Sequence, residues 1–372
     1  MTGTIIVLGT NAGQADLIRH MKERGWTVVG VSPRRGEAGQ ALCDIVEYVD
    51  ITDLDALVRI VQRHNADLVY SISSDVAIRS VTALAERYGL PRFFDSAFIS
   101  LLDHKANLRA FLRDHDLETI AFREVSDSRD LADWTIFPCI VKPVDAQGQR
   151  GVVRVDSSDA LIPMVEAAFE YSRSGSAIVE EFLEGVEMSC NVLLCGGETA
   201  IKVLSERLVH GGDLMGVPKG HLVPPKHVSM MDQQAASDLV DRIIASFGQK
   251  AGPLYFQMIV TPKGPRIVEI APRLDGCHMW RLIKAVTGID LLERTVDCLL
   301  EKGQPGELFT LKPGLITELL FQQSAPGDRF ETRKFPVPAD VLYHEYRYSD
   351  GDAIDPINGR LEVVGYYIRA MT

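Results

Sequence analysis

Alternation between short apolar runs and amphipathic helical patterns in the first hundred residues most constrains the fold. An apolar run at residues 4–8 ends in Gly9-Thr10-Asn11-Ala12-Gly13, a helical pattern follows, and residues 27–31 form a second apolar run. Strand, glycine turn, helix and strand in this order make a βαβ unit, which implies a parallel sheet. The alternation continues to residue 88. Residues 1–100 are therefore predicted to form a small, doubly wound, Rossmann-like domain.

The glycine turn at residues 9–13 has two interpretations. A dinucleotide-binding turn has the pattern G-x-G-x-x-G, and the second and third glycines are missing at that spacing. The simpler interpretation is a tight strand-to-helix turn whose helix N-terminus faces a polar group. The turn alone therefore does not predict hydride chemistry.

Charge and composition disfavour several classes of protein. The net charge of −12 repels nucleic-acid phosphates and anionic lipid, so neither is a predicted partner. The chain has no uninterrupted apolar run of about 18 residues, and no basic leader segment at its start, so neither a membrane span nor a signal peptide is predicted. The six cysteines form no CxxC pair, which fits a reduced, cytoplasmic compartment.

A lysine ends an apolar run at residues 136–143 and is followed by a glycine-containing loop. Lys142 in such a position is unfavourable unless its ammonium reaches water or meets an anion. One interpretation is a surface lysine whose charged end extends into solvent. The other is a phosphate contact, because the backbone amides of the loop at residues 145–151 could fold over phosphates.

A carboxylate and a guanidinium stand close together in Val268-Glu269-Ile270-Ala271-Pro272-Arg273. A carboxylate at the end of an apolar run needs a cation or hydrogen-bond donors. Glu269 could pair with Arg273, or it could hold a magnesium ion that also binds nucleotide phosphates.

Five motifs in a fixed order make the chain resemble the ATP-grasp superfamily, in the branch of carboxylate–amine ligases that includes biotin carboxylase and the L-amino acid ligases. The resemblance covers about residues 1–310. The motifs that follow the Rossmann-like segment are Asp103-x-Lys105-x-x-x-Arg109 in a helical pattern at residues 100–115, Phe137-Pro138-x-Ile140-Val141-Lys142-Pro143, the glycine loop, Val179-Glu180-Glu181-Phe182-Leu183-Glu184-Gly185-x-Glu187, and Val268-Glu269-Ile270-x-Pro272-Arg273.

The resemblance implies an α/β ATP-grasp fold in three parts. The Rossmann-like domain at 1–100 would precede an ATP-grasp domain at 101–310, whose central lid subdomain would span about 136–205. Short alternating strands with Pro and Gly turns at 311–372 predict a small antiparallel C-terminal cap.

The resemblance also implies which residues contact the phosphates of ATP. Lys105 and Lys142 would bind them, with Lys142 also near the adenine. Gly148, Gly151 and Val152 would lie in the loop that closes over the β- and γ-phosphates.

The remaining nucleotide contacts would come from the segment after residue 179. The resemblance implies that Glu180 takes the adenine amino group and that Glu181 and Leu183 offer backbone groups to the ring edge. Glu187 would bind the ribose hydroxyls.

Metal binding and catalysis would involve the last motif, where the chain departs from the family. The resemblance implies that Glu269 holds Mg2+, for which Mn2+ could substitute, and that Arg273, with Lys142, acts catalytically by steadying the acyl phosphate. The family usually has an acidic residue twelve positions before the metal-binding Glu, where this chain has Gln257, and Asn where Ala271 stands. Gln257 could still ligate magnesium through its amide oxygen.

The implied function is an ADP-forming ligase of the EC 6.3 type. It would activate a carboxylate as an acyl phosphate and join it to an amine, forming an amide or peptide bond on small amino-acid-like substrates. Two alternatives stay open: a bicarbonate-dependent carboxylase-type reaction, and a nucleotide-binding protein without catalysis. Related ligases are often dimers, so a homodimer is compatible with the resemblance.

Residues for the substrate are less specified. Gly276 would line the substrate pocket, and Arg281 would either pair with a substrate carboxylate or form a salt bridge on a helix surface. The Gly-, Pro- and His-rich stretch at 210–227 is predicted to be a loop that acts as a substrate lid. In it His221 is either a general base or incidental. Cys277 is expected to serve packing only.

Overall fold

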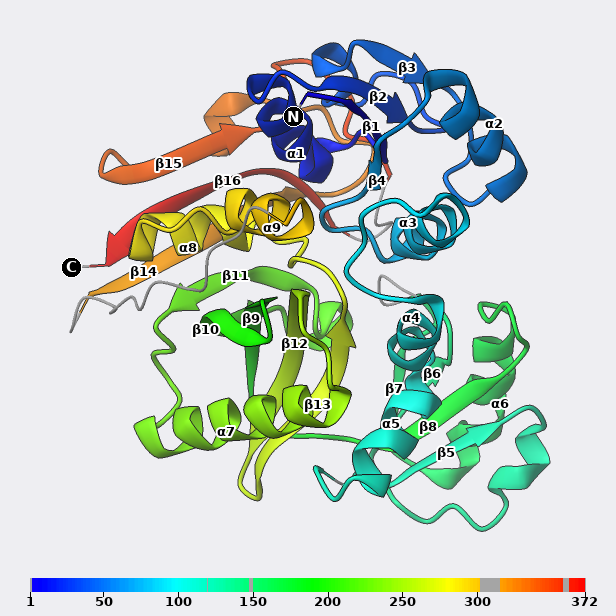
Figure 1. The fold of residues 1–372 in the computed structure, drawn as a ribbon. Coiled ribbons are helices and arrows are strands. Elements are labelled where there is room, and N and C mark those ends of the chain that lie inside the picture. The colour runs from blue at the N-terminus through cyan, green and yellow to red at the C-terminus, as the bar shows by residue number, and fades with distance from the viewer. Residues whose placement is uncertain (1, 119, 147–149, 302–314, 357–360, 372) are drawn as a thin grey trace.

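The computed structural model (Figure 1) describes residues 2–118, 120–146, 150–301, 315–356 and 361–371. Within them the strands form three sheets, of four, eight and four strands. Helices cover these sheets, and none in the described part of the chain has the length and apolar character needed to cross a membrane.

The first four-stranded sheet is parallel, as the βαβ pattern predicted, with the order β3-β2-β1-β4. Strands β1, β2 and β4 are apolar and mostly buried, because helices and following segments cover them, whereas β3 at the sheet edge is partly exposed. The elements are β1 (Thr4–Leu8), α1 (Ala12–Glu23), β2 (Thr27–Val31), the 3-10 helix η1 (Gln40–Leu42), β3 (Ile45–Glu47), α2 (Leu54–His64), β4 (Leu68–Tyr70) and α3 (Asp75–Tyr88).

The helical pattern at 100–115 forms two helices, so the predicted single helix is wrong. They are α4 (Ser96–Asp103) and α5 (Lys105–Asp114), and between them His104 has extended backbone angles (φ −98°, ψ 107°). The helix breaks because the first N–H of α5 donates to the carbonyl oxygen of Val144 (3.1 Å), which lies in another part of the chain.

The second four-stranded sheet is antiparallel, with the order β5-β8-β6-β7. Its apolar face packs under α6 and forms a small separate core. Its strands run from residue 122 to 181, whereas β9 and β10, which the predicted 136–205 subdomain included, lie in the eight-stranded sheet. The elements are β5 (Phe122–Val125), η2 (Ser128–Leu131), β6 (Cys139–Pro143), β7 (Val153–Val155), α6 (Ser158–Phe169) and β8 (Ala177–Glu181).

The eight-stranded sheet is antiparallel throughout, with the order β13-β12-β9-β10-β11-β14-β16-β15. Helix α7 packs against β12 and β13, α8 against β11 and β14, and α9 against β9 and β12 (Figure 1). The elements are β9 (Val186–Cys195), β10 (Glu198–Val209), η3 (Gly212–Leu214), β11 (Pro218–Val223), α7 (Met230–Phe247), β12 (Gly252–Thr261), β13 (Gly264–Ala271), α8 (Met279–Thr287), α9 (Leu291–Leu299), β14 (Ile316–Ser324), η4 (Thr332–Lys334), β15 (Val341–Tyr346) and β16 (Glu362–Met371).

Two features of this sheet refine the predictions. The C-terminal strands are antiparallel as expected, and they continue the central sheet because β14 pairs with β11. The stretch at 210–227 was predicted to be a lid loop, which is wrong, since β11 occupies its middle and is inserted between β10 and β14.

Candidate active site

A buried carboxylate joins two buried cations where the small antiparallel sheet meets α5. Lys142 on β6 and Glu180 on β8 lie on paired strands, and Lys142 Nζ is 2.6 Å from Glu180 Oε2. Arg109 Nε of α5 donates to Glu180 Oε1 at 2.7 Å. Burial opposes ionisation of Glu180, but Arg109 and Lys142 outweigh it and lower its pKa to about 2. The carboxylate is therefore charged at neutral pH.

Arg109 also connects the small sheet to the eight-stranded sheet. Its Nη1 and Nη2 donate to the carbonyl oxygens of Ile267 (2.6 Å) and Val268 (3.1 Å) on β13. The N–H of Ile267 donates in turn to Glu118 Oε2 (2.8 Å). Because Arg109 bonds both β13 and Glu180 on β8, it links the two sheets directly. The motif analysis noted Arg109 without a role.

The other predicted lysine faces the metal-binding candidate. Lys105 and Glu269 line one small hollow together with Asp75. Lys105 Nζ donates to the carbonyl oxygen of Ala146 (2.7 Å), and burial lowers the pKa of Lys105 against the attraction of Glu269. The side chain of Glu269 forms no hydrogen bond or ion pair with any other residue that the structure describes. The hollow thus holds a lysine and a carboxylate that are not paired directly.

Arg273 does not pair with Glu269, contrary to one of the two interpretations of the sequence. Its guanidinium forms a two-pronged ion pair with Asp75, in the first turn of α3, with Nη2 at 2.5 Å from Oδ2. Burial acts against the charged guanidinium, but Asp75 outweighs it and raises the pKa of Arg273. Sequence analysis missed Asp75, since 198 residues separate the two partners.

The two predicted metal ligands stand opposite each other on neighbouring strands. Gln257 on β12 and Glu269 on β13 are partners in the strand register, a position in which side chains are close. The Nε2 of Gln257 donates to Glu187 Oε2 (3.1 Å), so its amide oxygen stays available. Arg207 also pairs with Glu187. Two oxygen donors side by side fit a magnesium ion, which binds one or two protein oxygens together with phosphate oxygens.

The predicted adenine-binding segment follows β8. The backbone N–H of Glu181 donates to the carbonyl oxygen of Ala121 (2.9 Å), so this N–H is already used within the protein. The Glu181 carboxylate accepts from Ala121 N (3.2 Å), and Leu183 is half-buried beyond the strand end.

The predicted phosphate loop is described only in part. Gly148 lies outside the described residues. Gly151 has a left-handed backbone (φ +70°), and a Cβ there would lie 2.9 Å from the ring of Pro143. Glycine is therefore required at this position. Val152, next to it, leads into β7.

Of the predicted substrate residues, His221 lies beside Asp275 and Cys277, the neighbours of Gly276, whereas Arg281 has other contacts. His221 is fully buried in β11, and burial, outweighing Asp275, lowers its pKa to about 4. Its predicted place in a lid loop is therefore wrong. Gly276 is exposed in the segment between β13 and α8. Arg281 donates to Asp16 (2.6 Å), so the salt-bridge interpretation describes its contacts.

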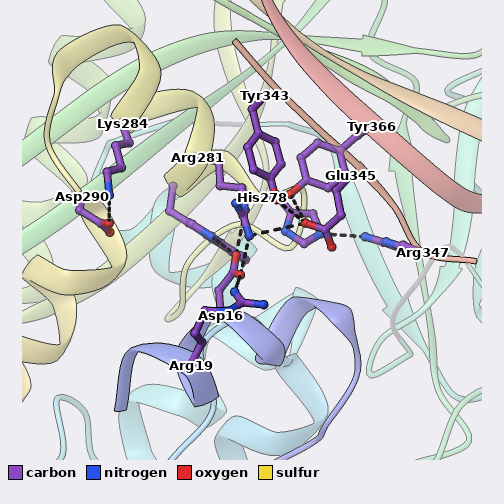
Figure 2. A network of polar contacts seen from close by, with 11 residues as sticks. Asp16, Arg19, His278, Arg281, Lys284, Asp290, Tyr343, Glu345, Arg347 and Tyr366 are labelled. Carbon is purple, nitrogen blue, oxygen red and sulfur yellow. Dashed lines mark hydrogen bonds and ion pairs between the residues drawn. The ribbon is translucent and has the colours of Figure 1, made fainter. Parts of the chain in front are cut away.

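Arg281 belongs to a polar network that joins α1, α8 and β15 (Figure 2). Its guanidinium lies over the Tyr343 ring (4.2 Å to the centroid) and 3.5 Å from Glu345. Next to it, His278 Nε2 lies 2.7 Å from Arg347 Nη2. The His278 ring stacks on the Tyr366 ring, with 4.6 Å between the ring centroids. Through His278, the network anchors the C-terminal end of the segment that carries Gly276. A list of sequence motifs could not reveal it, because its members come from distant elements.

Comparisons with known proteins agree with this geometry. The model of a family described as an ATP-grasp domain matches residues 135–280. The chain is 26% identical over 224 residues to the formate-dependent phosphoribosylglycinamide formyltransferase of Synechococcus sp. (strain CC9605), covering 59% of this chain and 54% of that one. It is 27% identical over 246 residues to the phosphoribosylamine–glycine ligase of Caulobacter vibrioides, covering 60% and 56%. The chain thus spans about half the length of these relatives.

The similarity in structure covers more of the chain than the similarity in sequence. The crystal structure of an L-amino acid ligase from Bacillus licheniformis superposes with a TM-score of 0.83 at 16% identity, covering 99% of this chain and 93% of that one. The chain therefore has the ATP-grasp fold, with a Rossmann-like domain before it and antiparallel strands after it. The resemblance to the carboxylate–amine ligases of the ATP-grasp superfamily is confirmed.

Proposed function

We propose that the protein is an ATP-dependent ligase that activates a carboxylate and joins it to an amine. The observation that supports the proposal is the incomplete charge pairing in the small hollow that α3, α4, α5 and β13 line. Among the described residues, Lys105 donates only to a backbone carbonyl there, and the Glu269 carboxylate has no direct partner. A ligand with phosphate oxygens and a bound cation would supply the missing partner to each of them.

Lys105 and Lys142 would bind the phosphates. Burial lowers the pKa of Lys142 as well as that of Lys105, so each ammonium gains from a nearby anion. Lys142 has Glu180, which is shared with Arg109. The triphosphate of ATP would bring negative charge to both lysines, and the loop that includes Gly151 would cover it.

Glu269 and the amide oxygen of Gln257 would hold Mg2+, or Mn2+ in its place. When bound, the cation supplies positive charge that neutralises phosphate oxygens during transfer. Glu187 fixes the Gln257 amide, so that its oxygen faces away from Glu187. The departure from an acidic residue at position 257 is thus compatible with a cation site.

The adenine amino group would donate to Glu180. The carboxylate has about four acceptor positions on its two oxygens, and Arg109 and Lys142 occupy one on each oxygen. A further donor can therefore be accepted without breaking either ion pair. Leu183 would offer a backbone group to the ring edge, and Glu187 would accept from the ribose hydroxyls.

The reaction would run in two steps. An oxygen of the substrate carboxylate attacks the γ-phosphorus, which gives an acyl phosphate and ADP. The amine nitrogen then attacks the acyl carbon, the C–O bond to phosphate breaks, and the amine loses a proton. Arg273 would stabilise the charge on the acyl phosphate, since Asp75 holds its guanidinium in place.

The test is ADP release from Mg-ATP with single and paired amino acids and small carboxylates, with products identified by mass spectrometry. Release that needs both an acid and an amine, with an amide product, is expected. Lys142→Ala should abolish this release. Lys202→Ala, which removes a surface lysine paired with Asp241 at 2.7 Å, is the matched control and should keep it. Equal turnover in the two variants would reject the proposed site.

A further inference from the structure

Three side chains with metal-binding atoms meet where β11 lies beside the segment that joins β13 to α8. His221 comes from β11, and Asp275 and Cys277 come from the segment between β13 and α8. A ring nitrogen, a carboxylate oxygen and the sulfur of these residues all lie within 4.8 Å of one another. None of the three belongs to the proposed nucleotide or magnesium site.

Each of the two most buried members has one atom fixed by a hydrogen bond and one atom left over. His221 Nδ1 is 3.2 Å from Ser205 Oγ, and Ser205 Oγ is in turn 2.7 Å from Ser189 Oγ. Asp275 Oδ1 accepts from the N–H of Cys277 (3.0 Å). His221 Nε2 and Asp275 Oδ2 are buried, and neither has a hydrogen-bond partner among the residues that the structure describes. Both residues are almost inaccessible to solvent, with exposed fractions of 0% and 3%.

The spacing of these two atoms fits a cation better than a water molecule. His221 Nε2 and Asp275 Oδ2 are 3.8 Å apart, too far for a direct hydrogen bond. A water bonded to both at about 2.8 Å would need an angle near 85° between its partners, well below a tetrahedral angle. A tetrahedral cation with bonds of about 2.0–2.1 Å places its ligands about 3.3–3.4 Å apart. A shift of about 0.5 Å would close that difference.

The positive charges near the cluster each have a carboxylate partner, which reduces their repulsion of a bound cation. Arg207 and Arg273 are the cations whose charges act most on Cys277. Arg207 already pairs with Glu187 and Arg273 with Asp75. Their repulsion of a further positive charge is therefore partly offset by their own carboxylate partners.

The ligand types define the class of ion. Sulfur, imidazole and one carboxylate oxygen favour zinc or a similar thiophilic divalent cation, whereas magnesium prefers oxygen ligands alone. Three protein ligands leave a fourth position open.

The site also has a path to solvent. Gly276, between Asp275 and Cys277, is exposed, and Cys277 is only half-buried. An ion can therefore enter beside the segment that carries two of its ligands.

We propose that His221 Nε2, Asp275 Oδ2 and Cys277 Sγ bind one zinc or similar thiophilic divalent cation, apart from the magnesium that Glu269 and Gln257 would hold. The second nitrogen of His221 and the second oxygen of Asp275 are held by hydrogen bonds, an arrangement that orients metal ligands in proteins. The site does not depend on the proposed ligase reaction.

The experiment uses the untagged full-length chain, stripped of metal by dialysis against a chelator under reducing conditions and then titrated with Co2+. The expected result is one Co2+ per chain, with visible bands of tetrahedral intensity and a thiolate-to-cobalt charge-transfer band in the near ultraviolet. Zn2+ should displace the Co2+. A stoichiometry near zero for both ions, or saturation without the charge-transfer band, would overturn the proposal.

Variants locate the ion. Cys277→Ser should remove the charge-transfer band, and Asp275→Asn should weaken Co2+ binding more than about tenfold, since even residues behind the metal ligands contribute that much. Cys43→Ser, which changes another half-buried cysteine between η1 and β3, is the matched control and should bind as the wild type does. A charge-transfer band that persists in Cys277→Ser would place the metal elsewhere and refute the site. Metal binding is measured without ATP, so failure of the ligase assay leaves this result unaffected.

Discussion

Replacing Glu180 by Gln should destabilise the small antiparallel sheet by about 3 kcal/mol. The substitution keeps the shape of the side chain but leaves Lys142 and Arg109 without their shared anion. The pKa of Glu180 falls from 4.5 to about 2, and at 1.36 kcal/mol for each unit this corresponds to about 3 kcal/mol. The loss of one partner from a buried ion pair, about 3–5 kcal/mol, has the same magnitude.

The assay should report on this sheet alone, because a chain of several units need not unfold in one step. Trp134 packs in the core of the small sheet, whereas Trp26 and Trp280 lie in the main core. Urea unfolding would therefore be followed by Trp134 fluorescence in a background with Trp26→Phe and Trp280→Phe.

Glu181→Gln is the matched control, because its half-buried carboxylate accepts only the Ala121 N–H. It should lose no more than about 1 kcal/mol. If Glu180→Gln lost no more stability than Glu181→Gln, the claim that Glu180 stabilises two buried cations would be refuted.

The same variant gives a test by pH. The folded pKa of Glu180 lies below its unfolded value, so its contribution is complete above about pH 4.5 and disappears as the pH falls toward about 2. The wild type should therefore lose stability over this range more steeply than Glu180→Gln. Parallel acid unfolding curves for the two proteins would contradict the assignment.

Three further substitutions test other parts of the site. Gln257→Glu puts a second carboxylate beside Glu187, so the melting temperature in thermal scans should fall without divalent cation and recover with Mg2+. A melting temperature that does not depend on Mg2+ would argue against a cation at Glu269. Gly151→Ala forces a side chain into a left-handed backbone position and should weaken Mg-ATP binding about tenfold or more in a calorimetric titration. Unchanged affinity would mean that this loop does not bind the nucleotide. Arg281→Ala should lower the free energy of unfolding by about 1–2 kcal/mol without changing KM for ATP; a raised KM would instead assign Arg281 to the active site.

The parts of the fold that local patterns determine were predictable from the sequence. The parallel N-terminal sheet follows from apolar runs and a glycine turn that lie within thirty residues of each other. The break at His104 was not predictable, because it depends on the carbonyl oxygen of Val144, 39 residues from Lys105. Strand β11 was missed because Pro218 and Gly220 suggest a loop, and its pairing partner β14 lies about a hundred residues later. At Gly220 a Cβ would lie 2.1 Å from the Leu319 carbonyl oxygen, so the glycine that suggested a loop is what permits the strand pairing.

The candidate site divides in the same way. Its motif residues stand at strand ends, where a charge in an apolar context is visible in the sequence, as with Lys142 and Glu269. Their partners belong to other elements: Arg109 is 71 residues from Glu180, and Asp75 is 198 residues from Arg273.

Buried charges of this kind are stable only when both partners are present, because removing one leaves the other without compensation. Arg109 bonds a carboxylate on β8 and two carbonyl oxygens on β13, so the charge that sets the pKa of Glu180 also fixes the distance between the two sheets. The position of Lys142 relative to Glu269 therefore depends on Arg109, which belongs to neither strand. For this reason the geometry of the site arises only from the assembled fold, although each of its motif residues can be recognised locally.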